Sequence, residues 1–380
     1  MSAPPPAVAT LRAAYERELA ARGYRADEAQ LKALAELEGL RRQILARPKR
    51  GTLARLLGRR ARGGAGVAEG PGGGVYLWGA VGRGKTWLMD LFCASLPGEA
   101  RRLHFHHFMR EVHALLGRLR QRRDPLPVVA GALAARSTVL CLDELFVADI
   151  ADAMILGGLF EALLCADVAL VITSNTAPGQ LYRDGLQRAR FLPAIELLER
   201  KLRIVELDGA VDYRLRELKR RSIYLSSQSP DTPARLAALF EALATRGSQS
   251  RRDLLIQGRS LHAFRRSGEV VWFSFATLCE GARSQNDYVE LAEDFHTVLL
   301  SEVPVFAEPQ QEDAARRFVA LVDELYDQGV KLIVSAAASP ETLYRGERLR
   351  ETFQRTVSRL TEMQSEAYLA RPHGRGVVVA

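Results

Sequence analysis

The stretch VYLWGAVGRGKTWLMDLF, residues 75–92, decides the fold that we expect for this chain. A short apolar strand runs into a Gly-rich turn, and the turn runs into a sequence of helical character. Gly79 and Gly84, followed by Lys85 and Thr86, match the pattern GxxxxGK[ST], in which glycines let backbone N–H groups wrap a phosphate without Cβ clashes. The stretch therefore predicts a phosphate loop between a strand and a helix.

The residues of this loop are predicted to bind the nucleotide together. Lys85 is expected to reach the β- and γ-phosphate oxygens, and Thr86 is expected to ligate Mg²⁺. The complete set of predicted nucleotide-binding residues in the loop is Gly79, Ala80, Val81, Gly82, Arg83, Gly84, Lys85 and Thr86.

A second motif supplies the acids that a phosphate loop requires. The apolar run in TVLCLDEL ends in Asp143 and Glu144. Asp143 is expected to bind Mg²⁺ through water, and Glu144 to orient and polarise the attacking water. The two motifs together predict an ATPase with ATP and Mg²⁺ as cofactors.

Three further polar residues are candidates for catalytic roles. Asn175 follows the apolar run VALVITS and is predicted to be a water-positioning sensor; the alternative is an ordinary turn residue. Arg188 and Arg190 precede an apolar helix, where one of them could reach the γ-phosphate of a neighbouring subunit. The alternative for the arginines is a helix start held by salt bridges.

The chain alternates short apolar strands with helical stretches, which predicts an α/β fold with a parallel sheet covered on both faces. The predicted organisation is an N-terminal helical segment (1–57), a Gly/Arg-rich linker (58–74), the P-loop core (75–210) and a C-terminal α/β tract (211–380). The predicted strands of the core are 75–78, 102–105, 138–142, 168–173 and 203–207, and those of the C-terminal tract are 269–275, 297–301 and 331–336.

The C-terminal tract contains segments whose sequences are similar to segments of the core. VALVITSNTAPGQLYR (168–183) and VKLIVSAAASPETLYR (330–345) share a strand, a Pro and Leu-Tyr-Arg at equal spacing, and upstream VLCLDELFV (139–147) faces VLLSEVPVF (298–306). We hypothesise that the tract is a degenerate copy of the core that has lost the phosphate machinery. The alternative is that strand-turn-helix units simply recur in α/β proteins.

Charge and hydropathy narrow the classes of protein further. The net charge is +8, and residues 41–62 carry nine Arg and Lys with no acid. This stretch is either a solvated linker or a basic arm for anionic lipid, nucleic acid or an acidic protein. No apolar run reaches the roughly 18 residues that span a bilayer, and the N-terminus lacks the pattern of a secretory signal, so we expect a cytoplasmic protein.

Taken together, these stretches resemble the ZapE-type (Afg-like) ATPases of bacterial cell division and their mitochondrial relatives, a branch of the AAA+ class. The matching stretches include GAVGRGKTWLMDLF, HFHHFMREVH, LCLDELFVADIADAMIL, ITSNTAPGQLYRDGLQRARFLPAI and SQNDYVELAEDF. They lie between about residues 11 and 370. The sequence departs from the family in its Gly/Arg-rich linker and at Phe146.

The resemblance implies a P-loop NTPase fold of AAA+ type, Mg²⁺-dependent ATP hydrolysis and a homo-oligomer. It also implies remodelling or destabilisation of filaments of the division protein FtsZ, with recruitment to the division site or inner membrane surface. Gln30 could read the adenine edge, and the alternative is a surface side chain. The segment from His106 to Met109 could contact a partner or line a ring pore.

A different function remains open from the sequence. The chain could be an ATP-gated adaptor or loader that binds a membrane surface, nucleic acid or a protease partner. The basic stretch 41–62 favours this alternative, whereas the absence of a recognisable DNA-binding motif weakens it.

Overall fold

The computed structural model describes residues 10–22, 26–47, 73–80, 82–119, 122–208, 218, 222–244, 253–371 and 373. The chain divides into two compact units, Met1–Val211 and Asp212–Ala380, and each is described by itself. No helix among the described residues is long and apolar enough to cross a membrane.

The N-terminal unit is built on a five-stranded sheet with the order β2-β3-β4-β1-β5, and every neighbouring pair is parallel. Each strand lies within two residues of its predicted position, which confirms the predicted α/β class. The elements of this unit are α1 (Leu11–Arg22), α2 (Glu28–Ala46), β1 (Gly74–Trp78), α4 (Lys85–Ala94), β2 (Ala100–His104), α5 (Phe105–Gly117), α6 (Leu126–Ala134), β3 (Val139–Asp143), α7 (Ile150–Cys165), β4 (Ala169–Ser174), η1 (Pro178–Gln180), η2 (Arg188–Arg190), α8 (Leu192–Lys201) and β5 (Leu202–Glu206).

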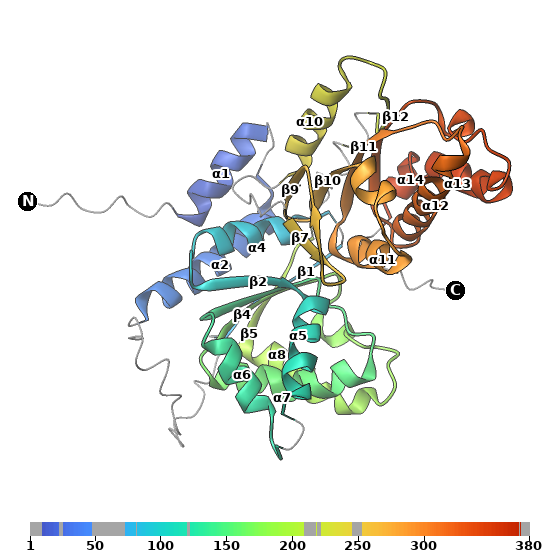
Figure 1. Ribbon diagram of the computed structural model, residues 1–380. Coiled ribbons are helices and arrows are strands. Elements are labelled where there is room, and N and C mark those ends of the chain that lie inside the picture. Colours follow the sequence, from blue (N-terminus) through green and yellow to red (C-terminus); the bar gives the residue numbers. More distant parts are fainter. Residues whose placement is uncertain are drawn as a thin grey trace, which may run out of the picture. The chain divides into compact units, whose positions relative to one another are not determined.

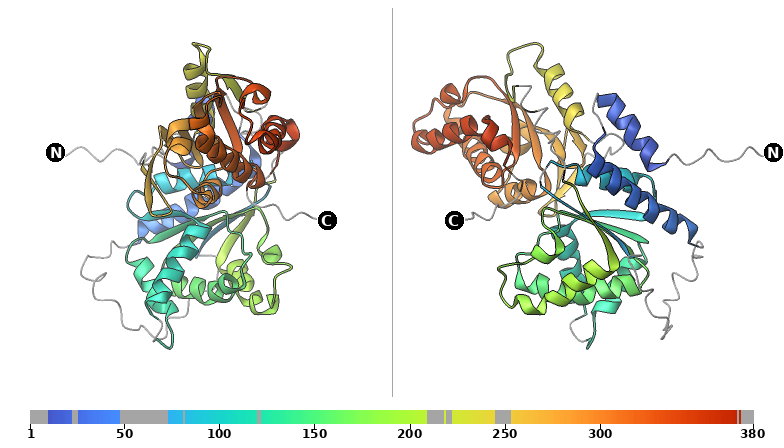
Figure 2. Two further views of the ribbon diagram at one scale, coloured as in Figure 1. Left: turned by 45° about the vertical axis from the view of Figure 1, so that its right-hand side comes forward. Right: turned by 180° about the vertical axis from the view of Figure 1, so that it is seen from behind.

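Helices cover both faces of this sheet (Figures 1 and 2). Alternate residues of each strand point to opposite faces, so one strand contributes side chains to two hydrophobic cores. Val75 and Leu77 pack with α1, α2 and α4, whereas Tyr76 packs with α5, α6, α7 and α8. The N-terminal helices are therefore part of the same folded unit as the sheet.

The structure corrects one prediction for the basic stretch. Arg41 is buried in α2 and pairs with Glu38 (3.1 Å), so the stretch begins as packed helix and not as solvated linker. Arg47 donates a hydrogen bond to the carbonyl of Asp167 (2.9 Å). Residues 48–72, which hold six of the nine basic residues and most of the predicted linker, lie outside the described residues.

The C-terminal unit is also α/β. Its main sheet has the order β6-β12-β11-β10-β9, in which only the β9–β10 pair is antiparallel, and β7 and β8 form a separate hairpin. The elements are β6 (Tyr224–Ser226), α10 (Thr232–Leu243), β7 (Asp253–Ile256), β8 (Arg259–His262), β9 (Arg265–Ser267), β10 (Val270–Ser274), the π-helix η3 (Ala276–Glu280), α11 (Gln285–Asp294), β11 (Thr297–Val303), η4 (Pro309–Gln311), α12 (Glu312–Asp327), β12 (Lys331–Ala336), η5 (Pro340–Thr342), α13 (Arg350–Glu362) and α14 (Glu366–Leu369).

This second sheet is likewise covered on both faces (Figure 1). Helix α10 packs with Leu225, Leu299 and Ile333 on one face. Helices α11, α12 and α13 pack on the other face, against residues that include Val298 and Val334. The alternation along each strand again separates two cores.

Candidate functional site

The phosphate loop lies between β1 and α4, and its backbone needs glycine. Gly82 and Gly84 have φ angles of 80° and 83°, in the left-handed region that other residues rarely adopt. A Cβ on Gly79 would lie 2.6 Å from the carbonyl oxygen of Leu207, which is backbone and cannot give way easily. Val81, the remaining predicted loop residue, lies outside the described residues.

Lys85 is buried at the start of α4, and its ammonium group is hydrogen-bonded to the beginning of the loop. The Nζ atom donates hydrogen bonds to the carbonyls of Gly79 (2.7 Å) and Ala80 (2.8 Å). The lysine charge is thus held within the loop that is predicted to wrap the phosphates. A phosphate bound there would meet a cation and the first N–H groups of a helix, and both favour an anion.

Asp143 is completely buried at the end of β3, and Thr86 reaches it from α4. The Thr86 Oγ1 donates a hydrogen bond to the Asp143 Oδ1 (3.1 Å), and the Thr173 hydroxyl of β4 donates to the same oxygen. A hydroxyl and a carboxylate oxygen at this separation suit Mg²⁺, which prefers oxygen ligands. The structure therefore brings together the two residues that the sequence predicts for the metal.

Arg102 is a member of this cluster that the sequence analysis missed. Its guanidinium forms an ion pair with Asp143 and another with Asp90 of α4 (Nε to Oδ1, 3.0 Å). Arg102 lies in β2, which pairs with β3. Only the strand order places the two residues side by side, so the sequence held no signal for this contact.

Glu144 follows directly after β3 in a conformation that is unusual for a side-chain-bearing residue. Its φ angle is 55°, and its backbone N–H donates a hydrogen bond to the Thr173 hydroxyl (2.9 Å). Such conformations cost about 1–3 kcal/mol and concentrate at functional sites. Thr173, which the sequence analysis also missed, thus supports both predicted acids from the neighbouring strand.

Asn175 is exposed at the first position after β4. The residues on either side of it are fixed: the Ser174 hydroxyl donates to the Leu145 carbonyl (2.8 Å), and the Tyr76 hydroxyl donates to the Thr176 carbonyl (3.0 Å). Burial raises the pKa of Tyr76 well above its ordinary value, so this donor keeps its proton. Asn175 follows the carboxyl end of β4, at the same edge of the sheet where β3 ends with Asp143. Its sensor role stays a prediction.

The two candidate arginines differ in accessibility. Arg188 is half-buried in the short 3₁₀ helix η2, and its Nη2 donates to the carbonyl of Gly179 (2.7 Å). Arg190, two residues later, is exposed. Both arginines stay candidates for the trans-acting finger, and Arg190 is the more accessible of the two.

Gln30 is buried, with 2% of its surface exposed, and so the surface alternative is wrong. Its Nε2 donates to the carbonyl of Arg83 in the loop (2.9 Å), and its Oε1 accepts from the Tyr15 hydroxyl of α1 (2.8 Å). Asp27 caps α2 by accepting from the Gln30 backbone N–H (3.0 Å). The Gln30 amide thus ties the N-terminal helices to the phosphate loop.

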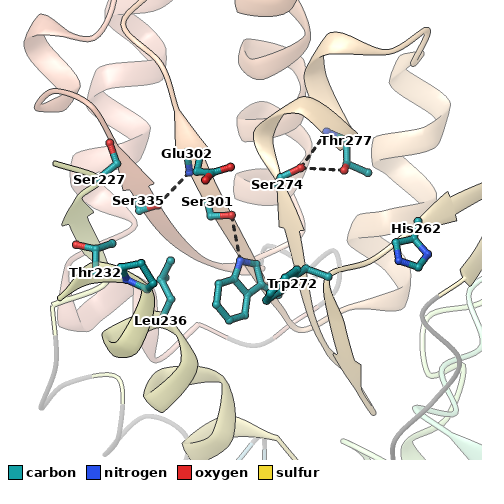
Figure 3. A pocket seen from close by; sticks show the side chains of 12 residues that line it. Ser227, Thr232, Leu236, His262, Trp272, Ser274, Thr277, Ser301, Glu302 and Ser335 are labelled. Carbon is teal, nitrogen blue, oxygen red and sulfur yellow. Dashed lines mark hydrogen bonds between the residues drawn. The ribbon is translucent and has the colours of Figure 1, made fainter. Parts of the chain in front are cut away.

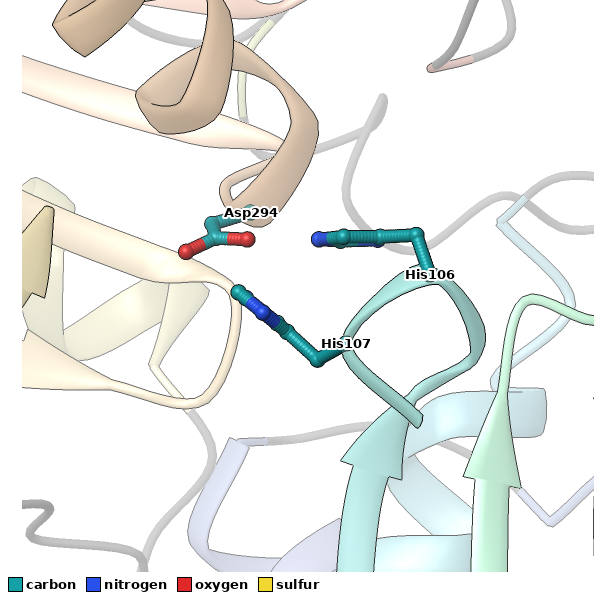
Figure 4. A group of neighbouring side chains, drawn as sticks. All are labelled: His106, His107 and Asp294. Atoms are coloured by element: carbon teal, nitrogen blue, oxygen red, sulfur yellow. The ribbon is translucent and has the colours of Figure 1, made fainter. Parts of the chain in front are cut away.

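The segment from His106 to Met109 is helical, and its role in contacting a partner or lining a ring pore stays a prediction. It forms the first turn of α5, where Phe108 and Met109 are buried. His106 and His107 are half-buried beside each other, with ring centroids 4.2 Å apart (Figure 4). Two of the four side chains therefore serve the hydrophobic core.

Comparisons with known proteins find extended similarity. The family model of the AFG1-like ATPases matches residues 9–372. The cell division protein ZapE of Escherichia coli K12 is 50% identical over 304 residues, which cover 80% of this chain and 81% of that protein. The lactation elevated protein 1 homolog B of Danio rerio is 39% identical over 345 residues, covering 78% and 68%. Among solved structures, the comparison with DnaI covers 49% of this chain and 85% of the DnaI chain. The sequence identity is 18% and the TM-score is 0.34.

Proposed function

Because the chain belongs to the family of AFG1-like ATPases and is an ATPase of the P-loop, AAA+ class, we propose that it hydrolyses Mg²⁺-bound ATP to remodel or destabilise FtsZ-type division filaments. The family and the fold class are those expected from the sequence. The metal dependence, the roles of individual residues and the filament target are the proposed part.

The observation that carries the hydrolytic proposal is the contact of Thr86 with Asp143 next to the lysine of the loop. Thr86 Oγ1 and the Asp143 carboxylate would hold Mg²⁺, which would neutralise phosphate charge during the transfer. Lys85 would leave its carbonyl partners and contact the phosphate oxygens. The glycines of the loop let the backbone N–H groups approach the same oxygens closely.

Glu144 is assigned as the group that orients water and accepts its proton on a carboxylate oxygen. The hydrogen bond from its backbone N–H to Thr173 fixes the position of the main chain that carries it. Asn175 is proposed as the sensor at the end of the adjacent strand. Arg190 is proposed as the trans-acting finger, with Arg188 as the residue that holds its short helix to Gly179.

The filament part of the proposal rests on similarity to a relative named as a cell division protein. A finger supplied by a neighbour requires subunits in contact, so we propose a homo-oligomer at the division site. The alternative is an ATP-gated adaptor or loader on a membrane surface, nucleic acid or a protease. It is favoured by the basic side chains of residues 41–62.

Turnover and binding assays test the division of roles at the site. Lys85→Ala should abolish binding of a fluorescent ATP analogue, whereas Glu144→Gln should keep binding and lose hydrolysis by roughly a hundredfold or more, as removal of a general base typically does. Equal behaviour of the two variants would contradict the assignment.

Sedimentation of FtsZ filaments tests the target. The wild-type chain with ATP should lower the pelleted fraction, and the Glu144→Gln variant should not. Vesicles with anionic lipid and a duplex DNA serve as the other arms. Binding to either that disappears when Lys49 and the arginines between residues 50 and 62 are neutralised, with filaments unaffected, would favour the adaptor.

A further inference from the structure

The C-terminal unit contains a cavity of 340 Å³ at the carboxyl ends of its parallel strands (Figure 3). Side chains at or next to the ends of four strands line it, together with the first turn of α10. In open α/β sheets, the crevice at the carboxyl ends of the strands is where ligands bind. The cavity therefore lies where a sheet of this kind places a site.

Four strands of the sheet around this cavity have the same order as four strands of the sheet of the N-terminal unit. Strands β6, β12, β11 and β10 stand in the order of β1, β4, β3 and β2. The registers also agree: Tyr224 pairs with Val334 as Tyr76 pairs with Ile172. Helix α10 follows β6 just as α4 follows β1, and each packs on the corresponding face of its own sheet.

The strand register also shows which residues of β11 correspond to which residues of β3. This correspondence differs by one residue from the sequence alignment of 139–147 with 298–306. Thr297 pairs with Lys331 as Val139 pairs with Ala169. A one-residue slip would turn each side chain to the other face of the sheet. Glu302 therefore corresponds to Glu144, whereas the alignment of 139–147 with 298–306 set it against Asp143.

Two local details repeat within the two units. Glu302 has a φ angle of 66° and donates its backbone N–H to the Ser335 hydroxyl (3.0 Å), as Glu144 does to Thr173. The Tyr224 hydroxyl donates to the carbonyl of Ala338 (2.8 Å), as Tyr76 does to a carbonyl after β4. Recurrence of strand-turn-helix units alone does not require these contacts.

The residues that suit a phosphate are replaced around the second cavity. Pro233 stands nine residues after Tyr224, the same spacing that separates Lys85 from Tyr76. Ser301 stands in place of the magnesium-holding Asp143. The glutamate is kept and the lysine is lost, so this position in the fold keeps a carboxylate without the cation that suits a phosphate.

We propose that the C-terminal unit is a degenerate copy of the N-terminal one, and that its cavity binds an ammonium or guanidinium group carried on an alkyl stem. Glu302 supplies the counter-charge. Among the lining residues that the structure describes, it is the only acidic side chain, and none of them is a lysine or an arginine. Among the described residues, its carboxylate has no hydrogen bond or ion pair with another side chain.

The rest of the lining fits such a ligand. A lysine or arginine head group has only donors, and hydroxyl oxygens such as those of Ser335 and Thr277 are acceptors. The rings of Phe264 and Trp272 lie edge to face, 4.8 Å apart, and Phe264 is 58% exposed. An aromatic wall suits both an alkyl stem and a cation. His262 also lines the cavity, and its Nδ1 is hydrogen-bonded to the Asp253 carboxylate (2.8 Å).

Binding of agmatine to the full-length chain, measured by isothermal titration calorimetry, tests the proposal. The wild-type chain should bind agmatine, and Glu302→Gln should weaken binding about tenfold or more, because a hydrogen bond to a charged group is lost. Glu351→Gln, which changes an exposed glutamate of the same unit away from the cavity, should leave binding unchanged.

Two further arms complete the design. A short peptide with one central arginine, compared with agmatine, distinguishes a polypeptide side chain from a free small amine as the source. The Lys85→Ala variant should bind the probe as the wild type does, because its altered residue belongs to the N-terminal site. Absence of binding by both probes, or binding by the Glu302→Gln variant equal to that of the wild type, would overturn the proposal.

Discussion

Replacement of Arg102 by alanine is predicted to destabilise the N-terminal unit strongly. Arg102 is the shared partner of Asp143, which is completely buried, and Asp90, which is almost as buried; its own side chain is 20% exposed. Removing one partner of a buried ion pair costs about 3–5 kcal/mol, because a charge is left buried without compensation. Partial exposure of the guanidinium places the expected loss near the lower end, about 3 kcal/mol.

The matched control is Arg101→Ala on the same strand. Arg101 pairs with Glu111 (2.7 Å), and both side chains are partly exposed, so the loss should stay within about 1 kcal/mol. Urea unfolding is followed by tryptophan fluorescence in a Trp272→Phe background, where Trp78 and Trp87 report on the N-terminal unit alone. The Arg102→Ala midpoint should fall by about 1–2 M relative to the control.

Magnesium gives the same prediction a second readout. If Arg102 neutralises Asp143 in the absence of metal, Mg²⁺ with a non-hydrolysable ATP analogue should restore more stability to Arg102→Ala than it adds to the parent chain. Equal midpoints for the Arg102→Ala and Arg101→Ala variants, or equal stabilisation by the metal, would refute the reasoning.

Other substitutions test the rest of the site. Gly84→Ala should cost about 1–2 kcal/mol in urea unfolding, because its φ angle is 83° and the new Cβ would lie 2.7 Å from the Gln30 amide nitrogen; an unchanged midpoint would mean that the loop relaxes freely. Gln30→Ala should lower the unfolding midpoint, since a buried carbonyl and hydroxyl lose their partner at about 1–3 kcal/mol; a loss of affinity for ATP but not for GTP would instead support adenine recognition. Arg190→Ala should lower ATP turnover by about 10³-fold with ATP binding intact, and Arg188→Ala should do so less; the reverse order in a coupled ATPase assay would exchange the two roles.

Much of the N-terminal sheet followed from sequence because its central strands β1, β3 and β4 are continuous apolar runs, which is how strands buried on both faces appear. The short or polar strands of the C-terminal unit were not predicted from the sequence. β6 has three residues, β7 buries alternate side chains and β8 buries only Leu261, so none of the three contains a hydrophobic run long enough to be recognised. Their pairing partners, not their composition, make them strands.

The sequence by itself determined the position of the Gly-rich loop and of the acids at the end of β3, because glycine spacing and strand-end carboxylates are local patterns. Only the tertiary structure decided that Arg102 and Thr173 share Asp143, and that Gln30 is buried against the loop. Those contacts join residues far apart in the chain, and strand order and helix packing bring them together. The same holds for the second cavity. Only the strand registers show that Glu302 corresponds to Glu144, because the sequence alignment alone is off by one residue.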